Sequence, residues 1–210
     1  MTLIAINVLL DPDAATVERA RAVNARLRHN EPRGFALDAD HAPHITLVQA
    51  FVRQADVEAV AGALRNAVQS EPTHTWQSTA TGFYHLADGE RGLMGIVIQS
   101  TEDLRRLQRC VLDTLAPFLV AEGSAAAFAP RPDGQPLSAA TLDYVSHFAA
   151  SRTGERYHPH LTVGLGSLDF ITALEAEPFE PFPVRAVGLS LYQLGEYGVA
   201  QVKLHELLRC

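Results

Sequence analysis

The sequence has few cysteines and no long hydrophobic run. Its 210 residues include only two cysteines, Cys110 and Cys210, which is too few for a disulfide framework and fits a reducing, cytoplasmic environment. The apolar segment 3–10 is short and is followed by acidic residues, so it is expected to be a strand rather than a signal peptide. No apolar stretch approaches the roughly 20 residues that cross a bilayer, so no membrane partner is expected.

An excess of positive charge is also missing. Lys and Arg total 17 against 24 Asp and Glu, which gives a formal net charge of −7 at pH 7. Proteins that hold long nucleic acids carry a basic face, because each contacted phosphate favours a cation. We therefore expect no long nucleic-acid partner. A small nucleotide or the end of an RNA remains compatible with this charge, because a local pocket needs only a few donors.

The composition is that of a globular protein with a sizeable core. Hydrophobic residues make up 47% of the chain and charged residues 20%. No low-complexity linker divides the sequence. Residues 1–210 are therefore expected to form a single domain, and a monomer is expected.

Strand and helix patterns alternate along the chain. The first half has predicted strands at 3–10, 44–51 and 73–84, and helices at about 11–29 and 57–68. The second half has predicted strands at 93–99, 158–165, 184–193 and 199–207, and helices at about 100–115, 138–150 and 167–175.

Each half therefore has the order strand, helix, strand, helix, strand. The first repeat covers about 1–85 and the second about 91–210, with an insertion at 120–155 and one additional C-terminal strand. Such a repeat predicts a bilobed α+β fold. Two pseudo-symmetric lobes, each with a small, mainly antiparallel sheet and outer helices, are expected to face each other across an active-site cleft.

The same short motif occurs at the same place in both repeats. It reads PHITL at 43–47 and PHLTV at 159–163. Side chains alternate between the two faces of a strand, so His44 and Thr46 are expected to share one face, roughly 6–7 Å apart. His160 and Thr162 are expected to do the same in the second lobe. If the lobes face each other, two imidazoles and two hydroxyls meet in the cleft.

These four side chains suit the cleavage of a phosphodiester. A histidine, with an ordinary pKa of about 6.5, can take a proton from the attacking oxygen, and a second one can protonate the departing oxygen. Threonine hydroxyls can donate hydrogen bonds to the non-bridging phosphate oxygens. His44 and His160 are therefore the predicted acid–base pair, and Thr46 and Thr162 the predicted substrate-binding hydroxyls. The sequence leaves open which histidine is the base.

The two motifs resemble the paired H-x-T-x motifs of the 2H phosphoesterase superfamily, which includes bacterial 2′-5′ RNA ligases and cyclic phosphodiesterases. The resemblance covers the order of the motifs and the repeat over nearly the whole chain, and the close match is limited to the motifs. It implies catalytic histidines, phosphate-binding threonines and no metal or other cofactor. The insertion at 120–155 departs from the pattern and leaves the substrate open.

Further residues are candidates for the cleft wall. His158 is expected on the strand face of His160, with an exposed strand-edge position as the alternative. Tyr84 is predicted to bind substrate by stacking on a base, with packing as the alternative, and the same choice applies to two other tyrosines. Those tyrosines are Tyr192 and Tyr197. Four arginines are placed to meet a second phosphate, unless they are simply solvated: Arg53, Arg91, Arg152 and Arg156.

We therefore expect a metal-independent phosphoesterase. Its expected substrate is a 2′,5′- or 2′,3′-cyclic phosphodiester of an RNA end or a small nucleotide, which it hydrolyses or transesterifies. A nucleotide-binding or sensing protein with little turnover is one alternative, which a turnover assay tests. A metallohydrolase built on the histidine cluster is another, which metal analysis tests. That cluster is His41, His44, His158 and His160.

Overall fold

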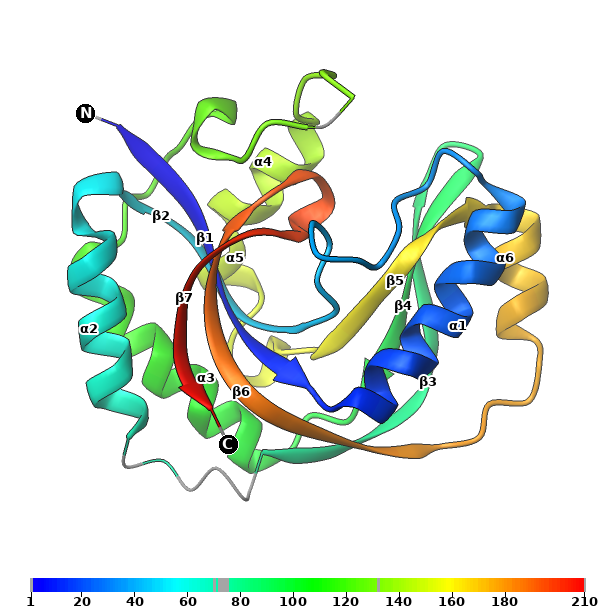
Figure 1. The fold of residues 1–210 in the computed structure, drawn as a ribbon, viewed down its shortest axis with the longest axis horizontal. Coiled ribbons are helices and arrows are strands. Elements are labelled where there is room, and N and C mark those ends of the chain that lie inside the picture. The colour runs from blue at the N-terminus through cyan, green and yellow to red at the C-terminus, as the bar shows by residue number, and fades with distance from the viewer. Residues whose placement is uncertain (1, 70, 72–75, 132, 210) are drawn as a thin grey trace.

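Strands and helices alternate along the chain in the predicted order (Figure 1). The computed structural model describes residues 2–69, 71, 76–131 and 133–209. The strands are β1 (Leu3–Pro12), β2 (Ile45–Arg53), β3 (Gln77–Asp88), β4 (Arg91–Ile98), β5 (His160–Ser167), β6 (Phe182–Leu194) and β7 (Ala200–Arg209). The helices are α1 (Ala14–Asn30), α2 (Val57–Val68), α3 (Glu102–Leu115), α4 (Ala139–Ser146), α5 (Phe148–Ser151) and α6 (Leu168–Glu175). Of the strand predicted at 73–84, positions 73–75 lie outside the described residues.

Side-chain caps begin most of these helices. The Asp13 carboxylate accepts a hydrogen bond from the backbone N–H of Thr16 at the start of α1. Helix α3 is capped by Thr101, whose hydroxyl accepts from the N–H of Leu104. Ser100, the first residue of the helix predicted at about 100–115, is the cap that the sequence favours, and the structure places the cap one residue later. Both residues have a suitable hydroxyl, and only the backbone register decides between them.

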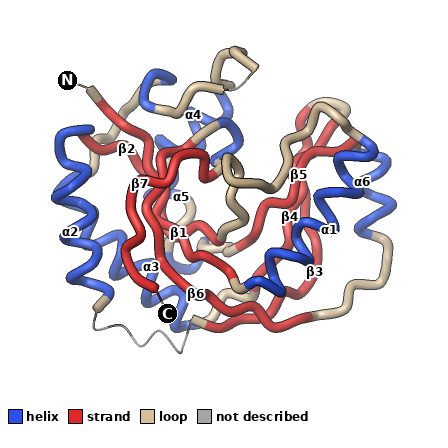
Figure 2. Tube along the Cα trace, viewed as in Figure 1, coloured by secondary structure: helices blue, strands red, loops and turns tan. Residues whose placement is uncertain are grey.

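The predicted mainly antiparallel α+β fold is confirmed, with one continuous sheet. Seven strands follow the order β2-β1-β6-β3-β4-β5, with β7 paired to β6, and every pairing between these described strands is antiparallel. Strand β6 bonds to β1 through its second half and to β3 through its first residues. It therefore joins a half-sheet made of β1, β2 and β7 to a second half-sheet made of β3, β4 and β5 (Figure 2).

The half-sheets do not coincide with the two halves of the sequence. Strand β3, from the first repeat, pairs with β4 of the second, and β6 of the second repeat pairs with β1 of the first. The helices are exchanged as well: α1 packs on β5, whereas α3 packs on α2 and β2 (Figure 1). The repeat boundaries near 85 and 91 thus describe the order of elements but not the division of the sheet. Strand pairing depends on long-range contacts, which a local pattern does not contain.

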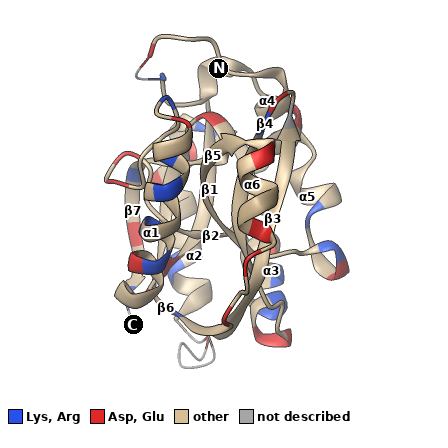
Figure 3. Cartoon of the chain, turned by 90° about the vertical axis from the view of Figure 1, so that its right-hand side faces the viewer, with Lys and Arg blue, Asp and Glu red and all other residues tan. Residues whose placement is uncertain are grey.

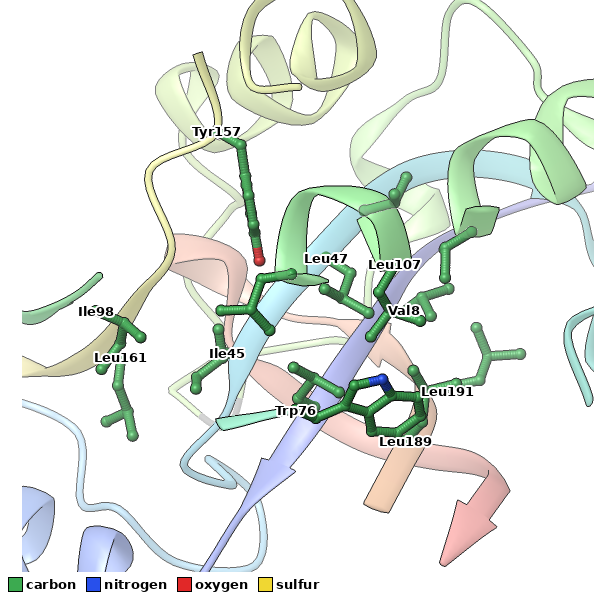
Figure 4. Packing of buried hydrophobic residues seen from close by; sticks show 14 of the residues in the cluster. Val8, Ile45, Leu47, Trp76, Ile98, Leu107, Tyr157, Leu161, Leu189 and Leu191 are labelled. Atoms are coloured by element: carbon green, nitrogen blue, oxygen red, sulfur yellow. The ribbon is translucent and has the colours of Figure 1, made fainter. Parts of the chain in front are cut away.

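One hydrophobic cluster runs through both half-sheets. Ile45 and Leu47 of β2 and Leu161 of β5 belong to it and are buried. Figure 4 shows these three side chains in the same cluster as Trp76, which is 2% exposed, and Leu107 of α3. The apolar positions of both motifs therefore point into the core, and the polar positions of the motifs are left on the opposite face of the sheet.

Charged side chains lie mainly on the outer helices and loops. In Figure 3 the basic and acidic residues are interspersed on these elements, and no single element carries only Lys and Arg over its length. Within the described part of the chain, no helix is long and apolar enough to span a membrane.

Candidate active site

The two motif histidines stand at the starts of equivalent strands. Strand β2 begins at Ile45, directly after His44, and β5 begins at His160. A proline precedes each histidine and has no N–H to contribute to a strand ladder. In β5, exposure alternates from half-buried His160 and Thr162 to fully buried Leu161, as expected for a strand with one face on the core.

Both imidazoles are held by the same local hydrogen bond. Nδ1 of His44 lies 2.7 Å from the carbonyl oxygen of Ala42, and Nδ1 of His160 lies 2.9 Å from that of His158. A carbonyl can only accept, so each Nδ1 carries the proton. Each Nε2 is then the nitrogen that is available to take or give a proton, and the two histidines present the same atom.

Burial lowers the pKa of both imidazoles. The pKa of His44 falls to about 4, mainly because desolvation disfavours the charged ring; the Ala42 carbonyl opposes the shift and the charge of His160 adds to it. The pKa of His160 is also lowered by burial, with the His158 carbonyl opposing and the charge of Arg152 adding. A bound phosphate brings negative charge and therefore shifts both values upward.

The side chain of Thr46 has a buried hydrogen-bond partner on the neighbouring strand. The side-chain amide of Asn7, on β1, donates to the Thr46 hydroxyl oxygen across 3.3 Å. Asn7 is fully buried, and its carbonyl oxygen has no partner among the described residues. The hydroxyl of Tyr157 donates to the backbone carbonyl of Thr46 at 2.9 Å. Because its oxygen accepts from Asn7, the Thr46 hydroxyl keeps its own proton for a ligand.

Tyr84 reaches the second motif across a glycine. Tyr84 on β3 pairs with Gly95 on β4, and Gly95 pairs with Thr162 on β5. A Cβ atom at Gly95 would overlap the Tyr84 ring, so only glycine lets the ring lie flat over β4. The ring then meets His160 edge to face, with centroids 5.0 Å apart. Burial raises the pKa of the Tyr84 hydroxyl, and its hydrogen bond with Thr162 partly opposes this shift.

These groups line one cleft of about 610 Å³ between the half-sheets. Both motif histidines and both motif threonines contribute to its wall, together with Tyr84. Apolar residues from β3 and β4 line it as well, among them Leu86, Leu93 and Val97. Although the chain carries a net charge of −7, none of the described residues that line the cleft is acidic. The cleft therefore suits an anion that carries an apolar or aromatic group.

The insertion forms part of the cleft wall. It contributes Tyr144 of α4, Phe148 of α5 and Arg152, whose guanidinium carbon lies 5.2 Å from the centre of the Tyr144 ring. Buried Gln108 ties its end to the site: the Gln108 amide donates to the carbonyls of Leu47 and Arg152, each across 3.0 Å. The insertion thus brings a cation and aromatic surface next to His160.

Buried Glu196 fixes the other end of the insertion. It lies in the turn between β6 and β7, and its carboxylate accepts from the backbone N–H of Ser138 at 2.8 Å and from the Thr141 hydroxyl. Arg131 makes an ion pair with it at 3.1 Å. Burial raises the pKa of Glu196, but the hydrogen bonds from Ser138 and Thr141 outweigh it and leave the pKa below its usual value. The start of α4 is thus anchored to the turn.

The remaining sequence candidates occupy different places. His158 is exposed and lines the cleft, but it precedes β5, so the prediction that it lies on the strand is wrong; the strand begins only after Pro159. His41 and Arg91 line a second hollow. Arg53, Arg156 and Tyr192 do not line the cleft. Among the described residues, no three His, Cys, Asp or Glu side chains are grouped to hold a metal ion.

Several residues of the site carried little signal in the sequence. Asn7 interrupts the apolar run from Leu3 to Leu10, and this pattern was the one available hint of a buried hydrogen bond. Gln108 and Glu196 look like ordinary surface residues of a helix and a turn. Their roles depend on partners that are distant in the sequence.

Comparisons with known proteins agree with this architecture. Residues 9–196 match the model of the 2′-5′ RNA ligase superfamily. Apo LigT of E. coli is similar in structure, with 15% identity, coverage of 99% of this chain and 98% of that one, and a TM-score of 0.51. TT0787 of Thermus thermophilus has 12% identity, 98% coverage of both chains and a TM-score of 0.58.

LigT complexed with 3′-AMP matches with 15% identity, 100% coverage of this chain, 99% of that one and a TM-score of 0.52. At these identities the structural likeness shows the fold alone. No curated protein matches the sequence. The family match covers most of the chain, including both histidine motifs. The chain therefore belongs to the 2′-5′ RNA ligase superfamily.

Proposed function

We propose that this protein is a metal-independent phosphodiesterase that cleaves a 2′,5′- or 2′,3′-cyclic phosphodiester of an RNA end or small nucleotide. Membership of the superfamily supports a phosphodiesterase- or ligase-type activity on RNA or nucleotides. The complex of LigT with 3′-AMP supports a nucleotide ligand by analogy. The observation that carries the proposal is the pair of equivalent imidazoles, His44 and His160, in one cleft without a carboxylate among its described lining residues.

The chemistry needs two proton transfers on opposite sides of phosphorus. For a 2′,5′ linkage, the neighbouring 3′-hydroxyl loses its proton to one imidazole as its oxygen bonds to phosphorus. The bond from phosphorus to the 5′-oxygen breaks, and that oxygen takes a proton from the other imidazole. Hydrolysis of the cyclic product uses water as the nucleophile in the same manner. Thr46 and Thr162 donate hydrogen bonds to the non-bridging oxygens as charge builds on them.

We assign His44 as the base and His160 as the acid in the cleavage of the 2′,5′ linkage. Burial lowers the pKa of His44 to about 4, which favours the neutral ring that a base requires. His160 lies beside the Tyr84 ring, and the negative charge of a bound phosphate raises the pKa of His160 and favours its protonated form. The phosphate contributes the negative charge that the described cleft residues lack.

Turnover assays on single variants test the proposal. Wild-type protein is incubated with 2′,5′-linked dinucleotides and 2′,3′-cyclic nucleotides in the presence of a chelator. His44→Ala and His160→Ala are each expected to lower kcat by roughly 10²–10⁴-fold. His29→Ala, an exposed histidine in the last turn of α1, is the matched control and should retain wild-type turnover. Nucleotide binding without turnover in the wild type would instead favour a sensing protein, and zinc-dependent turnover a metallohydrolase.

A sulfur leaving group tests the assignment of the two histidines. A 2′,5′-linked dinucleotide with sulfur in place of the 5′-bridging oxygen releases a thiolate, which departs without a proton. This substrate is expected to restore the rate of His160→Ala to within about tenfold of the wild type, and to leave His44→Ala impaired. Rescue of His44→Ala alone would reverse the two roles.

A further inference from the structure

A second hollow opens beside the cleft and is not used by the proposed chemistry. It encloses about 370 Å³ and is lined by loop 31–44, the start of β4 and the turn between β6 and β7. Leu165 and Tyr197 line both the hollow and the catalytic cleft. Leu165 lies three residues beyond Thr162 on β5, or roughly 10 Å along the strand. The two spaces therefore share a wall, which lies roughly 10 Å along β5 from Thr162.

We propose that this hollow binds the nucleotide next to the reacting linkage, so that the preferred substrate is a short oligonucleotide rather than a mononucleotide. The inference rests on the proposed function, because it assumes that the cleft holds a nucleotide phosphodiester. The inference specifies the length of the preferred substrate and the residues that recognise this length. Arginines of the hollow meet the neighbouring phosphate, and an aromatic group supports the neighbouring base.

The charge of the hollow supports a phosphate. Three arginines line it, and of these Arg131 is already committed: it pairs with Asp133 at 2.7 Å and with Glu196 at 3.1 Å. These carboxylates are the two acidic residues among those that line the hollow. Arg91 is half-buried at the start of β4, where it lines the hollow. A half-buried guanidinium is suited to a planar, bidentate contact with phosphate.

Arg33 adds an exposed positive charge to the hollow. Its guanidinium lies 3.5 Å from the Glu31 carboxylate, but the Arg33 side chain is 85% exposed. An ion pair at this exposure contributes little stability, so it does not compete strongly with a phosphate. Arg33 and Arg91 are therefore the two cations of the hollow that a polyanionic ligand can engage.

The aromatic groups of the hollow form a stack. The Phe35 ring lies parallel to that of His41, with centroids 5.1 Å apart and an interplanar angle of 11°. The Phe35 ring also approaches that of Tyr197, with centroids 6.4 Å apart and an interplanar angle of 30°. Aromatic side chains in this arrangement support a base through its π face, whatever the identity of the base.

The backbone at Tyr197 is strained where the two spaces meet. Its φ is 59° and its ψ is 16°, a left-handed conformation that is unfavourable for a tyrosine. The Tyr197 N–H donates to the Thr141 hydroxyl at 3.1 Å and to the Glu196 carboxylate, and these bonds maintain the conformation. Strain of this kind is retained at ligand sites because it fixes a side chain in place. Tyr197 is thereby fixed on the shared wall, where successive nucleotides would pass.

Binding measurements on two oligonucleotide lengths test the inference. The probes are a fluorescein-labelled triadenylate that ends in a 3′-phosphate and, as a competitor, the mononucleotide 3′-AMP. The wild type is expected to bind the trinucleotide at least about tenfold more tightly. Arg91→Gln and Phe35→Leu are each expected to weaken trinucleotide binding by about tenfold, from the loss of one phosphate contact or one stacked base. Binding of 3′-AMP should stay within about twofold of the wild type.

Arg209→Gln is the matched control for the loss of one positive charge. Arg209 ends β7, eight residues beyond Gln201 of the hollow, which is roughly 26 Å along the strand. This variant should bind both probes as the wild type does, and circular dichroism should show the same fold for all variants. The hollow is refuted as a subsite by equal wild-type affinity for the two lengths, or by a preference that Arg91→Gln and Phe35→Leu leave intact.

The same protein preparations separate this inference from the proposed function. Wild-type turnover of a 2′,3′-cyclic mononucleotide concerns the catalytic cleft alone. A protein that binds the trinucleotide selectively but turns over no substrate would contradict the proposed function and leave the subsite supported. A protein that turns over substrate but shows no length preference would support the proposed function and contradict the subsite.

Discussion

Asn7 of β1 donates a side-chain hydrogen bond to Thr46 of the neighbouring strand, across 3.3 Å. The bond uses the threonine oxygen as an acceptor and leaves its proton for the cleft. A fully buried asparagine in an otherwise apolar strand is costly unless it has such a partner. The buried Asn7 side chain thus orients the Thr46 hydroxyl, which lines the cleft.

Replacing Asn7 with aspartate should reverse this orientation. A carboxylate at position 7 accepts the Thr46 proton, so the hydroxyl no longer donates to phosphate. We expect Asn7→Asp to lower kcat by up to about 10²-fold, the loss that follows removal of one donor to a developing oxyanion. Asn7→Leu controls for the change in stability, because it leaves the Thr46 hydroxyl free to rotate. Equal kcat in Asn7→Asp and the wild type, measured on folded protein, would contradict the proposed role.

Valine substitution tests the two motif hydroxyls directly. Thr46→Val and Thr162→Val keep the branched shape and should each lose roughly 2–4 kcal/mol of transition-state stabilisation, mainly in kcat. Thr46→Val should also lower the free energy of unfolding by about 1–3 kcal/mol, because Asn7 loses its partner. Thr81→Val, at an exposed position of β3, is the control. Steady-state kinetics with urea unfolding distinguishes the two effects, and unchanged kcat/KM in both motif variants would remove the threonines from the mechanism.

The pH dependence of kcat/KM should be bell-shaped and displaced to acid. The base must be neutral, so activity rises as pH passes the lowered pKa of His44, about 4 in the free protein. The acid must be protonated, so activity falls as pH passes the pKa of His160, which burial lowers from 6.5. The maximum is therefore expected below pH 6.5, with both limbs belonging to the coupled pair.

Substrate binding should move the falling limb of that profile. The negative charge of a bound phosphodiester raises the pKa of the acid, so the falling limb of kcat should lie at higher pH than that of kcat/KM. Initial rates between about pH 4 and 9 at saturating and at low substrate concentration measure the two profiles. A kcat/KM that still rises above about pH 8 is incompatible with this pair.

A methyl group at Gly95 should displace Tyr84 from His160. The added Cβ atom would overlap the ring, so the ring must leave its place over β4. We expect Gly95→Ala to lower kcat/KM by roughly 10²-fold through misplacement of the second motif. Gly82→Ala on β3, where a Cβ meets nothing within 4 Å, is the control. In a Tyr84→Ala background, Gly95→Ala should add little further loss.

Neutralising Glu196 should loosen the insertion in a pH-dependent manner. Its pKa is below the usual value, so its contribution to stability is present above the unfolded value of about 4.5 and is lost as pH falls through the folded pKa. We expect Glu196→Gln to lower the free energy of unfolding by about 2 kcal/mol at pH 7. At about pH 3 the difference from the wild type should shrink. A difference that stays constant over this range would contradict a role for the charge.

The local part of this architecture was predictable from the sequence. Strands have a period of two, so the placement of His44 and Thr46 opposite Ile45 follows from the motif itself. The cap at Asp13 and the helical spacing of the apolar residues are local signals too. These signals give the order of elements and the faces of both motif strands.

The long-range part was not predictable in the same way. The exchange of β3 and β6 between the repeats depends on which strands pair, and pairing is decided by tertiary contacts. Glu196 is 58 residues from Ser138, its partner at the start of α4. A buried polar network of this kind is specified only when its members meet, so the residues by themselves look like surface residues.

Strand β6 determines how wide the cleft is. It is the connection through which hydrogen bonds pass from the half-sheet that carries His44 to the half-sheet that carries His160. The curvature of this thirteen-residue strand therefore sets the distance between the two imidazoles. To widen the cleft, β6 must become flatter while it stays hydrogen-bonded to β1, β3 and β7. The geometry of the acid–base pair is thus a mechanical property of the whole sheet and not of either motif.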